Sequence, residues 1–197
     1  MKNAFVIMLT TVLFATVPGC QKPIDDIIED NNEPPVNTVT YIIQEGQHFC
    51  TPNPFVTTTD SQLSFIAVFD SSCIYTTTDP VNQDDINKLF GFSDCNTQHI
   101  ENSARIGWRW SKDSLRLFGF VHNNGNIIYQ EIATAAIKQN ITCNITCEEK
   151  NYRFTVDGKS ITLPRNCSGN FNRYKLYPYF GGNEPAPHNV TVKLTEL

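Results

Sequence analysis

Hydrophobic and polar residues alternate along several short stretches in the second half of this chain. Within residues 103–110, the apolar residues Ala104, Ile106, Trp108 and Trp110 stand at every second position, with arginine or glycine between them. A period of two predicts a β-strand with one apolar face. Because large aromatic side chains dominate sandwich cores, we expect both tryptophans to be core residues rather than a sugar-stacking platform.

Turn-forming residues join further alternating segments in pairs. In residues 115–133, two such segments flank an Asn-Asn-Gly-Asn sequence, whose residues tolerate a positive φ. In residues 152–163, an Asp-Gly pair stands between two more alternating segments. Each arrangement predicts a β-hairpin. Additional strands are predicted over residues 39–43, 63–69 and 190–194.

One segment departs from this pattern. Ile86, Leu89 and Phe90 recur at helical spacing after Asp84, which predicts a single short helix over residues 84–90. Elsewhere Thr, Asn, Phe and Tyr are abundant, and windows rich in Ala, Leu and Glu are missing, which favours strands and loops. The predicted fold class is all-β: an antiparallel β-sandwich or jelly roll with at most one or two short helices.

The start of the chain has the composition of a leader. Lys2 precedes an apolar run over residues 4–17, which is too short to span a bilayer and predicts a signal peptide over residues 1–19. The run ends in Gly-Cys and resembles the signal of bacterial lipoproteins, which implies that Cys20 is diacylated and anchors the protein to a membrane. An ordinary secretory signal with a fortuitous cysteine is the alternative.

The segment behind Cys20 is acidic and contains prolines. Residues 20–37 are therefore predicted to be a lipidated cysteine followed by a flexible tether. An acidic cluster in this position also resembles the signal that places some lipoproteins on the outer face of the outer membrane, although solvation of a linker explains it equally well. The expected location is the outer membrane, at the cell surface or on the periplasmic face. Residues 38–197 suffice for a single β-sandwich domain.

Six cysteines follow Cys20, and an even number favours disulfides in an exported domain. We expect Cys95 to pair with Cys167, because both lie in loops rich in Ser, Asn and Gly. The other expected pairs are Cys50 with Cys73 and Cys143 with Cys147. The Cys-x-x-x-Cys motif has no second close Cys or His pair to complete a zinc site, so neither a metal nor another cofactor is predicted.

Two stretches resemble a known fold family. Residues 110–163, with a long hairpin and then Tyr-x-Phe-x-Val-Asp-Gly-Lys, look like the middle of concanavalin A-like lectin and glucanase sandwiches. Tyr-Phe-Gly-Gly at residues 179–182, followed by a strand over residues 189–195, resembles the closing segment of the same fold. The resemblance implies a jelly-roll sandwich, and it bears on the fold much more than on activity.

Catalytic residues are harder to find. Glucanases of this fold use two neighbouring carboxylates, whereas Glu131 is the one carboxylate within a predicted core strand. Jelly-roll polysaccharide lyases instead use Arg to neutralise a uronate carboxylate, and His or Tyr to move protons. The chain supplies these residue types, but Tyr177-Pro178-Tyr179 lacks the Lys and Gln that accompany the lyase tyrosines. No catalytic residue is therefore assigned, and a uronate lyase is the third hypothesis.

The leading hypothesis is a non-catalytic binding module whose sheet face holds a polysaccharide, especially an acidic one. The alternative is a structural or protein-interaction lipoprotein of an envelope assembly, with Arg105 and Arg109 merely paired to Glu131 or Asp113. The net charge is −5 and no basic stripe with interleaved aromatics is present, so nucleic acid is not an expected partner. The candidate ligand-binding residues are Arg105, Arg109, His122, Tyr129, Tyr177 and Tyr179.

Overall fold

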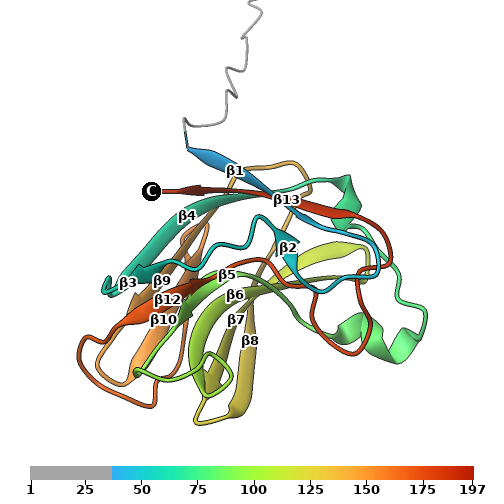
Figure 1. Ribbon diagram of the computed structural model, residues 1–197. Helices are drawn as coiled ribbons and strands as arrows, with labels where there is room; N and C mark the ends of the chain where they lie inside the picture. Colours follow the sequence, from blue (N-terminus) through green and yellow to red (C-terminus); the bar gives the residue numbers. More distant parts are fainter. Residues whose placement is uncertain (1–36) are drawn as a thin grey trace, which may run out of the picture. The chain divides into compact units, whose positions relative to one another are not determined.

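A computed structural model describes residues 37–197, which form two antiparallel β-sheets packed face to face (Figure 1). The predicted signal peptide, Cys20 and nearly all of the predicted tether lie outside the described residues. The helical turns within residues 37–197 are two short 3-10 segments, η1 (Ser71–Cys73) and η2 (Pro80–Asp84). None of the helical segments in this part of the chain has the length and apolar character needed to cross a membrane. The predicted all-β sandwich is confirmed.

The two sheets contain seven and six strands. The strands of the first are β1 (Thr38–Ile43), β2 (Cys50–Thr51), β4 (Gln62–Phe69), β9 (Ile141–Cys147), β10 (Asn151–Val156), β11 (Lys159–Pro164) and β13 (Val190–Glu196). The strands of the second are β3 (Thr57–Thr58), β5 (Asn87–Ser93), β6 (Asn102–Ser111), β7 (Ser114–Asn123), β8 (Asn126–Ala135) and β12 (Arg173–Leu176). Their orders are β11-β10-β9-β4-β13-β1-β2 and β3-β12-β5-β6-β7-β8.

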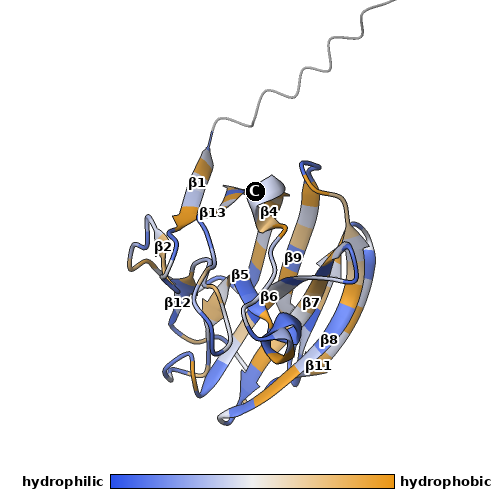
Figure 2. Cartoon of the chain, turned by 90° about the vertical axis from the view of Figure 1, so that its right-hand side faces the viewer, coloured by the Kyte–Doolittle hydropathy of each residue, from blue (hydrophilic) through white to orange (hydrophobic). Residues whose placement is uncertain are grey.

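The core lies between the two sheets. Along β6, Ala104, Ile106 and Trp108 are fully buried, as their alternation predicted, while Trp110 packs partly buried against the core. The rings of Trp108 and Phe69 meet edge to face with their centroids 5.3 Å apart, which joins β6 to β4 of the opposite sheet. Figure 2 shows the alternation of hydrophobic and polar residues along the strands. Each large apolar side chain buried here contributes about 1.5–3 kcal/mol.

Both predicted hairpins form. In the turn between β7 and β8, Asn124 and Gly125 have φ angles of 52° and 77°. In the turn between β10 and β11, Asp157 and Gly158 have φ angles of 45° and 79°. Two successive residues with positive φ match the twist of the strands that such turns connect, and Asn, Asp and Gly adopt this conformation at the lowest cost.

The predicted helix over residues 84–90 is wrong. After η2 the chain enters β5, which pairs with β6. A β-bulge between Lys88 and Phe90 allows the adjacent Leu89 and Phe90 both to be buried in the core. Ile86 packs instead against two phenylalanines of β7 on the opposite face of the sheet. A bulged strand with apolar residues on both faces therefore reproduced the spacing of a helix.

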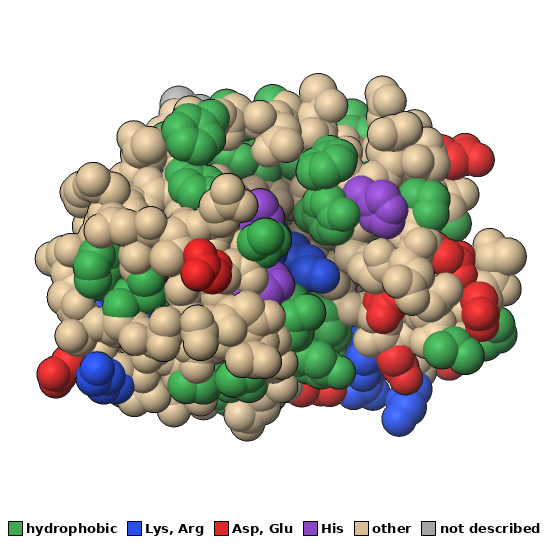
Figure 3. All heavy atoms as spheres, turned by 60° about the horizontal axis from the view of Figure 1, so that its bottom comes forward, with side chains coloured by type: hydrophobic (Ala, Val, Ile, Leu, Met, Phe, Trp, Pro, Cys, Tyr) green, Lys and Arg blue, Asp and Glu red, His purple; other side chains and the backbone are tan. Residues whose placement is uncertain are grey.

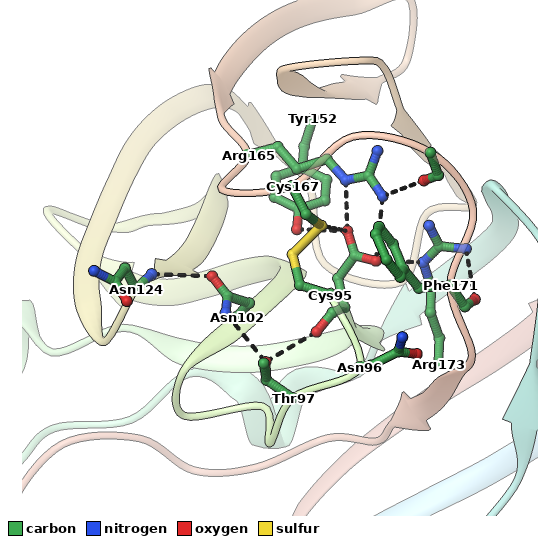
Figure 4. The surroundings of a disulfide bond; sticks show 12 residues. Cys95, Asn96, Thr97, Asn102, Asn124, Tyr152, Arg165, Cys167, Phe171 and Arg173 are labelled. Atoms are coloured by element: carbon green, nitrogen blue, oxygen red, sulfur yellow. Dashed lines mark hydrogen bonds and ion pairs between the residues drawn. A yellow bond between two sulfur atoms is a disulfide. The ribbon is translucent and has the colours of Figure 1, made fainter.

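One of the three predicted disulfides forms, and it lies beside a buried ionic network (Figure 4). Cys95 and Cys167 link the loop after β5 to the loop after β11, with their Cα atoms 5.7 Å apart. The adjacent Asp94 is completely buried. Its carboxylate accepts hydrogen bonds from Arg165 Nε at 2.6 Å and Arg173 Nε at 2.9 Å. A third comes from the hydroxyl of a tyrosine on β10 at 2.8 Å.

This network stabilises the charged form of the carboxyl group. Burial alone would raise the pKa of Asp94, but the hydrogen bonds from Arg165, a backbone N–H and the tyrosine, together with the charge of Arg173, lower the pKa below its usual value. The network connects the end of β5 with β10, with the loop after β11 and with the start of β12. It therefore fixes the position of β12, the strand that leads into the candidate site.

The other two predicted disulfides are wrong, because Cys50, Cys73, Cys143 and Cys147 are free. Cys143 and Cys147 lie four residues apart on the single strand β9. This separation corresponds to about 13 Å along an extended chain, whereas bridged cysteines have Cα atoms within about 7 Å. The thiols of Cys50 and Cys73 are buried, and each donates a hydrogen bond to a backbone carbonyl, at 3.2 and 3.3 Å.

Candidate functional site

The outer face of the six-stranded sheet, turned away from the core, carries aromatic and basic side chains. On β6, Arg105 and Arg109 project to this face, because the residues that alternate with them fill the core. On β7, Phe118, Phe120 and His122 share the face, and the strand register places Phe120 opposite Arg105. The outer face of an antiparallel sheet is usually polar and solvated. A face that combines buried phenylalanines with basic groups is a candidate binding surface.

Four residues on or beside this face form what we call the basic cluster: Lys88, His99, Arg105 and His122. The Nζ atom of Lys88 lies 4.7 Å from the centre of the Phe120 ring, and the guanidinium carbon of Arg105 lies 5.9 Å from the same centre. Within residues 37–197, Lys88 and Arg105 take part in no ion pair. Figure 3 shows His and Lys or Arg side chains at the floor of a hollow bordered by hydrophobic side chains.

Arg105 is the central member of the basic cluster. Its side chain is buried, with the residue only 6% exposed, and its Nε atom has no hydrogen-bond partner. Burial lowers the pKa of Arg105 to about 10, so the guanidinium still carries its charge at neutral pH. A buried charge without a counter-ion destabilises a fold. Its presence here therefore calls for a functional explanation.

The neighbouring groups respond to the same positive charge. Burial lowers the pKa of His122 to about 4, and the charges of Arg105 and Lys88 add to this effect, so His122 is neutral at pH 7. The pKa of His99 is lowered by burial and by Arg105. Burial and Arg105 also lower the pKa of Lys88 to about 8. An anion bound among these groups would favour their protonated forms.

A cavity of about 240 Å³ opens beside Arg105, and we call it the aromatic pocket. The rings of Phe49 and Tyr179 meet edge to face in its wall, with centroids 5.1 Å apart. The rings of Phe55 and Tyr174 lie tilted against each other at 5.4 Å. His99 also lines the cavity, and its backbone N–H donates to the hydroxyl of Tyr174 at 2.9 Å. The pocket thus combines apolar rings with a buried positive charge.

All six predicted ligand-binding residues lie on the outer face or border the aromatic pocket, and four of them are placed to meet a ligand. Arg105 and Tyr179 line the pocket. His122 and Tyr129 both pack on Phe120, with ring centroids 5.3 and 6.4 Å from it, and Tyr129 is half exposed. These residues come from β6, β7, β8 and the segment after β12, so the fold assembles them from distant parts of the sequence.

The two remaining predicted residues are engaged elsewhere. Tyr177 borders the aromatic pocket, but its ring stacks on Tyr41 at 5.6 Å and packs on Phe90 at 5.5 Å within the core. Arg109 lies on the outer face, where its Nη1 atom is 3.4 Å from the carboxylate of Asp84. Tyr177 therefore contributes mainly to packing, and the charge of Arg109 is already compensated.

The alternative in which the β6 arginines pair with Glu131 or Asp113 is not what the structure shows. Glu131 accepts two hydrogen bonds from Arg116 Nη1, at 2.9 and 3.0 Å. A register shift between β7 and β8 brings Glu131 opposite Phe118, beside Arg116 on β7. Such a shift depends on the bulge, which the alternation of residues does not reveal.

Sequence reasoning missed Lys88, His99, Phe120 and Tyr174. Lys88 was hidden by the wrong helix, and His99 and Tyr174 lie outside the strands predicted from alternation. Phe120 could have been found, because β7 has apolar residues on both faces and its outer face is therefore not simply solvated.

Comparisons with known proteins agree with this architecture. Alginate lyase AlyC3 has a TM-score of 0.55 and 11% identity, over 80% of this chain and 72% of that chain. A polysaccharide lyase of family 18 has a TM-score of 0.50 and 11% identity, over 84% of this chain and 89% of that chain. The catalytic domain of an endo-1,3-beta-glucanase (laminarinase) from Thermotoga petrophila has a TM-score of 0.50 and 8% identity, over 80% of this chain and 74% of that chain.

No protein-family model and no curated protein matches the sequence. The similarity to solved structures therefore establishes the fold. The chain has a jelly-roll sandwich fold of the concanavalin A-like type, as its hairpin and C-terminal segments suggested.

Proposed function

We propose that this protein binds an acidic glycan on the outer face of its six-stranded sheet, without cleaving it. The observation that carries the proposal is Arg105, a buried cation that has no ion pair and a buried Nε without a partner. A carboxylate of a bound uronate sugar would supply the missing counter-ion and hydrogen bonds. Lys88, which also lacks an ion pair, would add a second positive charge.

Aromatic residues of the same face suit the apolar sides of sugar rings. Tyr129 stacks on Phe120 at an interplanar angle of 10° and is half exposed, so its ring is available to a ligand. Tyr179 and Tyr174 provide further rings at the aromatic pocket. The solved structures with similar folds include enzymes named for alginate and for 1,3-beta-glucan, which supports a glycan as the ligand class.

Binding and stability measurements on Arg105→Met test this proposal. Affinity electrophoresis and calorimetry would compare alginate and polygalacturonate with neutral laminarin. We expect binding of the acidic polymers, and loss of that binding in Arg105→Met. Because the substitution removes a buried unpaired charge and keeps an apolar side chain of similar length, the melting temperature should stay the same or rise.

A matched control is Val81→Ala, since Val81 is 82% exposed on η2 and should change neither binding nor stability. Retention of no polysaccharide by the wild-type protein would contradict the proposal and favour the envelope-protein alternative. Undiminished polyuronate binding by Arg105→Met would exclude the proposed site. Destabilisation by Arg105→Met would show that the guanidinium has a structural role.

We further propose that Cys20 carries a lipid that holds the protein on the outer membrane, at its surface or on its periplasmic face. Support comes from the sequence of the leader and the acidic tether that follows it. Metabolic labelling with a fatty acid, followed by protease treatment of intact cells, tests both statements. The label should depend on Cys20, and a protein that partitions without label into the soluble fraction would contradict the anchor.

A uronate lyase is the second candidate, and the placement of His122 beside Arg105 supports it. His122 and the guanidinium of Arg105 both pack on the Phe120 ring, and the imidazole is neutral at pH 7, although its pKa of about 4 makes it a weak base. In β-elimination, a base removes the proton next to the carboxylate, the glycosidic bond breaks, and a second group protonates the leaving oxygen; Tyr179 could donate that proton. Formation of unsaturated product from polyuronates, absent in His122→Gln, would establish the lyase over simple binding.

A further inference from the structure

The aromatic pocket lies where the outer face of the sheet ends. The strand order places β12 and then β3 at the edge of the six-stranded sheet. Phe55 precedes β3, and its ring packs on Tyr174 of β12. Phe49, before β2, packs on Tyr179. These four aromatic residues line the pocket at this edge of the sheet, next to the strands that carry the basic cluster.

A glycan on the outer face would follow a row of groups that leads into this pocket. Tyr129 on β8 stacks on Phe120 of β7, and Phe120 lies opposite Arg105 of β6. Arg105 also lines the pocket, next to Tyr174. The row therefore crosses five of the six strands, from β8 to β12, and ends against Phe55 and its neighbours.

The pocket has the size of one ring. Its volume of about 240 Å³ is smaller than the ~300–1,000 Å³ of typical ligand sites, so it has no room for several sugar units. At its side the guanidinium of Arg105 offers a buried, uncompensated charge. The rings of Phe49 and Phe55 are 62% and 76% exposed, and large apolar groups left in solvent beside a cavity are typical of a binding site.

We propose that the aromatic pocket binds the terminal ring of an acidic glycan, so that the protein recognises chain ends rather than internal stretches. The carboxylate of that ring pairs with Arg105, and its apolar side packs on Phe55 and Tyr174. The rest of the glycan runs back across the sheet towards Tyr129. This inference rests on the proposed function, since it concerns the same ligand class and shares Arg105.

The number of protein molecules bound per glycan chain tests end recognition directly. Isothermal titration calorimetry of the full chain with oligogalacturonates of several defined lengths gives this number. An end-binding pocket yields one protein per chain at every length, once the chain is long enough to cross the sheet. If the number of bound proteins grows in proportion to chain length, internal stretches are bound and the proposal is overturned.

The substitution Phe55→Ala locates the effect in the pocket. Phe55 is largely exposed, so its removal leaves the core intact, and we expect about tenfold weaker binding of short oligogalacturonates. Val81→Ala is the control and should bind like the wild type. Unchanged affinity in Phe55→Ala would exclude the pocket as the site of the terminal ring.

The two proposals fail in distinguishable ways. If neither oligomers nor polymers bind, both the proposed function and the recognition of chain ends are refuted. If polymers bind with many proteins per chain, and Phe55→Ala has no effect, glycan binding stands and only the chain-end inference is lost.

Discussion

The substitution Asp94→Asn removes one negative charge from the most deeply buried ionic network of the described residues. The side chains of its two partners, Arg165 and Arg173, are 2% and 0% exposed, so water cannot replace the lost carboxylate. Breaking a buried ion pair by removing one partner costs about 3–5 kcal/mol. Since the free energy of unfolding of a domain is only about 5–15 kcal/mol, this substitution should remove a large part of the stability of the protein.

Urea unfolding with the disulfide intact measures this effect. With a slope of about 2 kcal/mol per molar for a domain of this size, the midpoint should fall by about 2 M. The matched control is Asp113→Asn, in an exposed turn between β6 and β7 where Asn also tolerates the positive φ of 53°. Equal midpoints for the Asp94 and Asp113 variants would refute the reasoning.

The pH dependence of the same variant provides a second measurement. Because the pKa of Asp94 is lowered in the folded protein, its contribution is fully present above about pH 4, the ordinary value for an unfolded Asp. It is lost as the pH falls through the folded pKa below that point. The difference in the free energy of unfolding between wild type and Asp94→Asn should therefore become smaller in acid. A difference that grew there would contradict the assigned direction of the pKa shift of Asp94.

Three further predictions concern the rest of the fold. Replacing Cys95 and Cys167 by Ser should lower the free energy of unfolding by up to ~4 kcal/mol, because the disulfide joins residues 72 apart in sequence; an unchanged urea midpoint would contradict this. A Cβ at Gly91 would lie 2.0 Å from the carbonyl oxygen of Ala104, so calorimetry of Gly91→Ala should show a loss of about 1–3 kcal/mol, and an unchanged melting temperature would disprove the contact. Because the pKa of His122 falls to about 4 in the folded protein, stability should decrease as the pH drops from about 6.5 to 4. His122→Gln should flatten this slope in a series of unfolding curves, and an unaltered slope would show that another group is responsible.

The fold could be predicted from the sequence wherever one face of a strand is buried. The alternation around Trp108 and the Asn-Gly and Asp-Gly turns are local signals, so β6 and both hairpins were found with nearly correct bounds. The segment at residues 84–90 failed because a bulge in β5 changes which side chains face the core. A bulge arises from pairing with β6, which lies outside the segment itself.

The candidate site could be predicted only in part, for a related reason. Arg105 stood out because a charged residue interrupts a strongly apolar strand. That its charge lacks a partner could not be foreseen, since the absence of an ion pair depends on the register of the neighbouring strands and on the loops around the pocket. Phe49 and Phe55 reach the site through such a loop, more than 40 positions before Arg105 in the sequence.

The pairing of β1 with β13, which brings Thr38 opposite Thr195, has a practical consequence. Both ends of the described chain leave from the seven-stranded sheet, and Figure 1 shows them together at the top of the sandwich. The basic cluster lies on the outer face of the other sheet, with the thickness of the core in between. A tag, bead or sensor surface attached at either end of the described residues should therefore leave the outer face of the six-stranded sheet open to long polymers in solution.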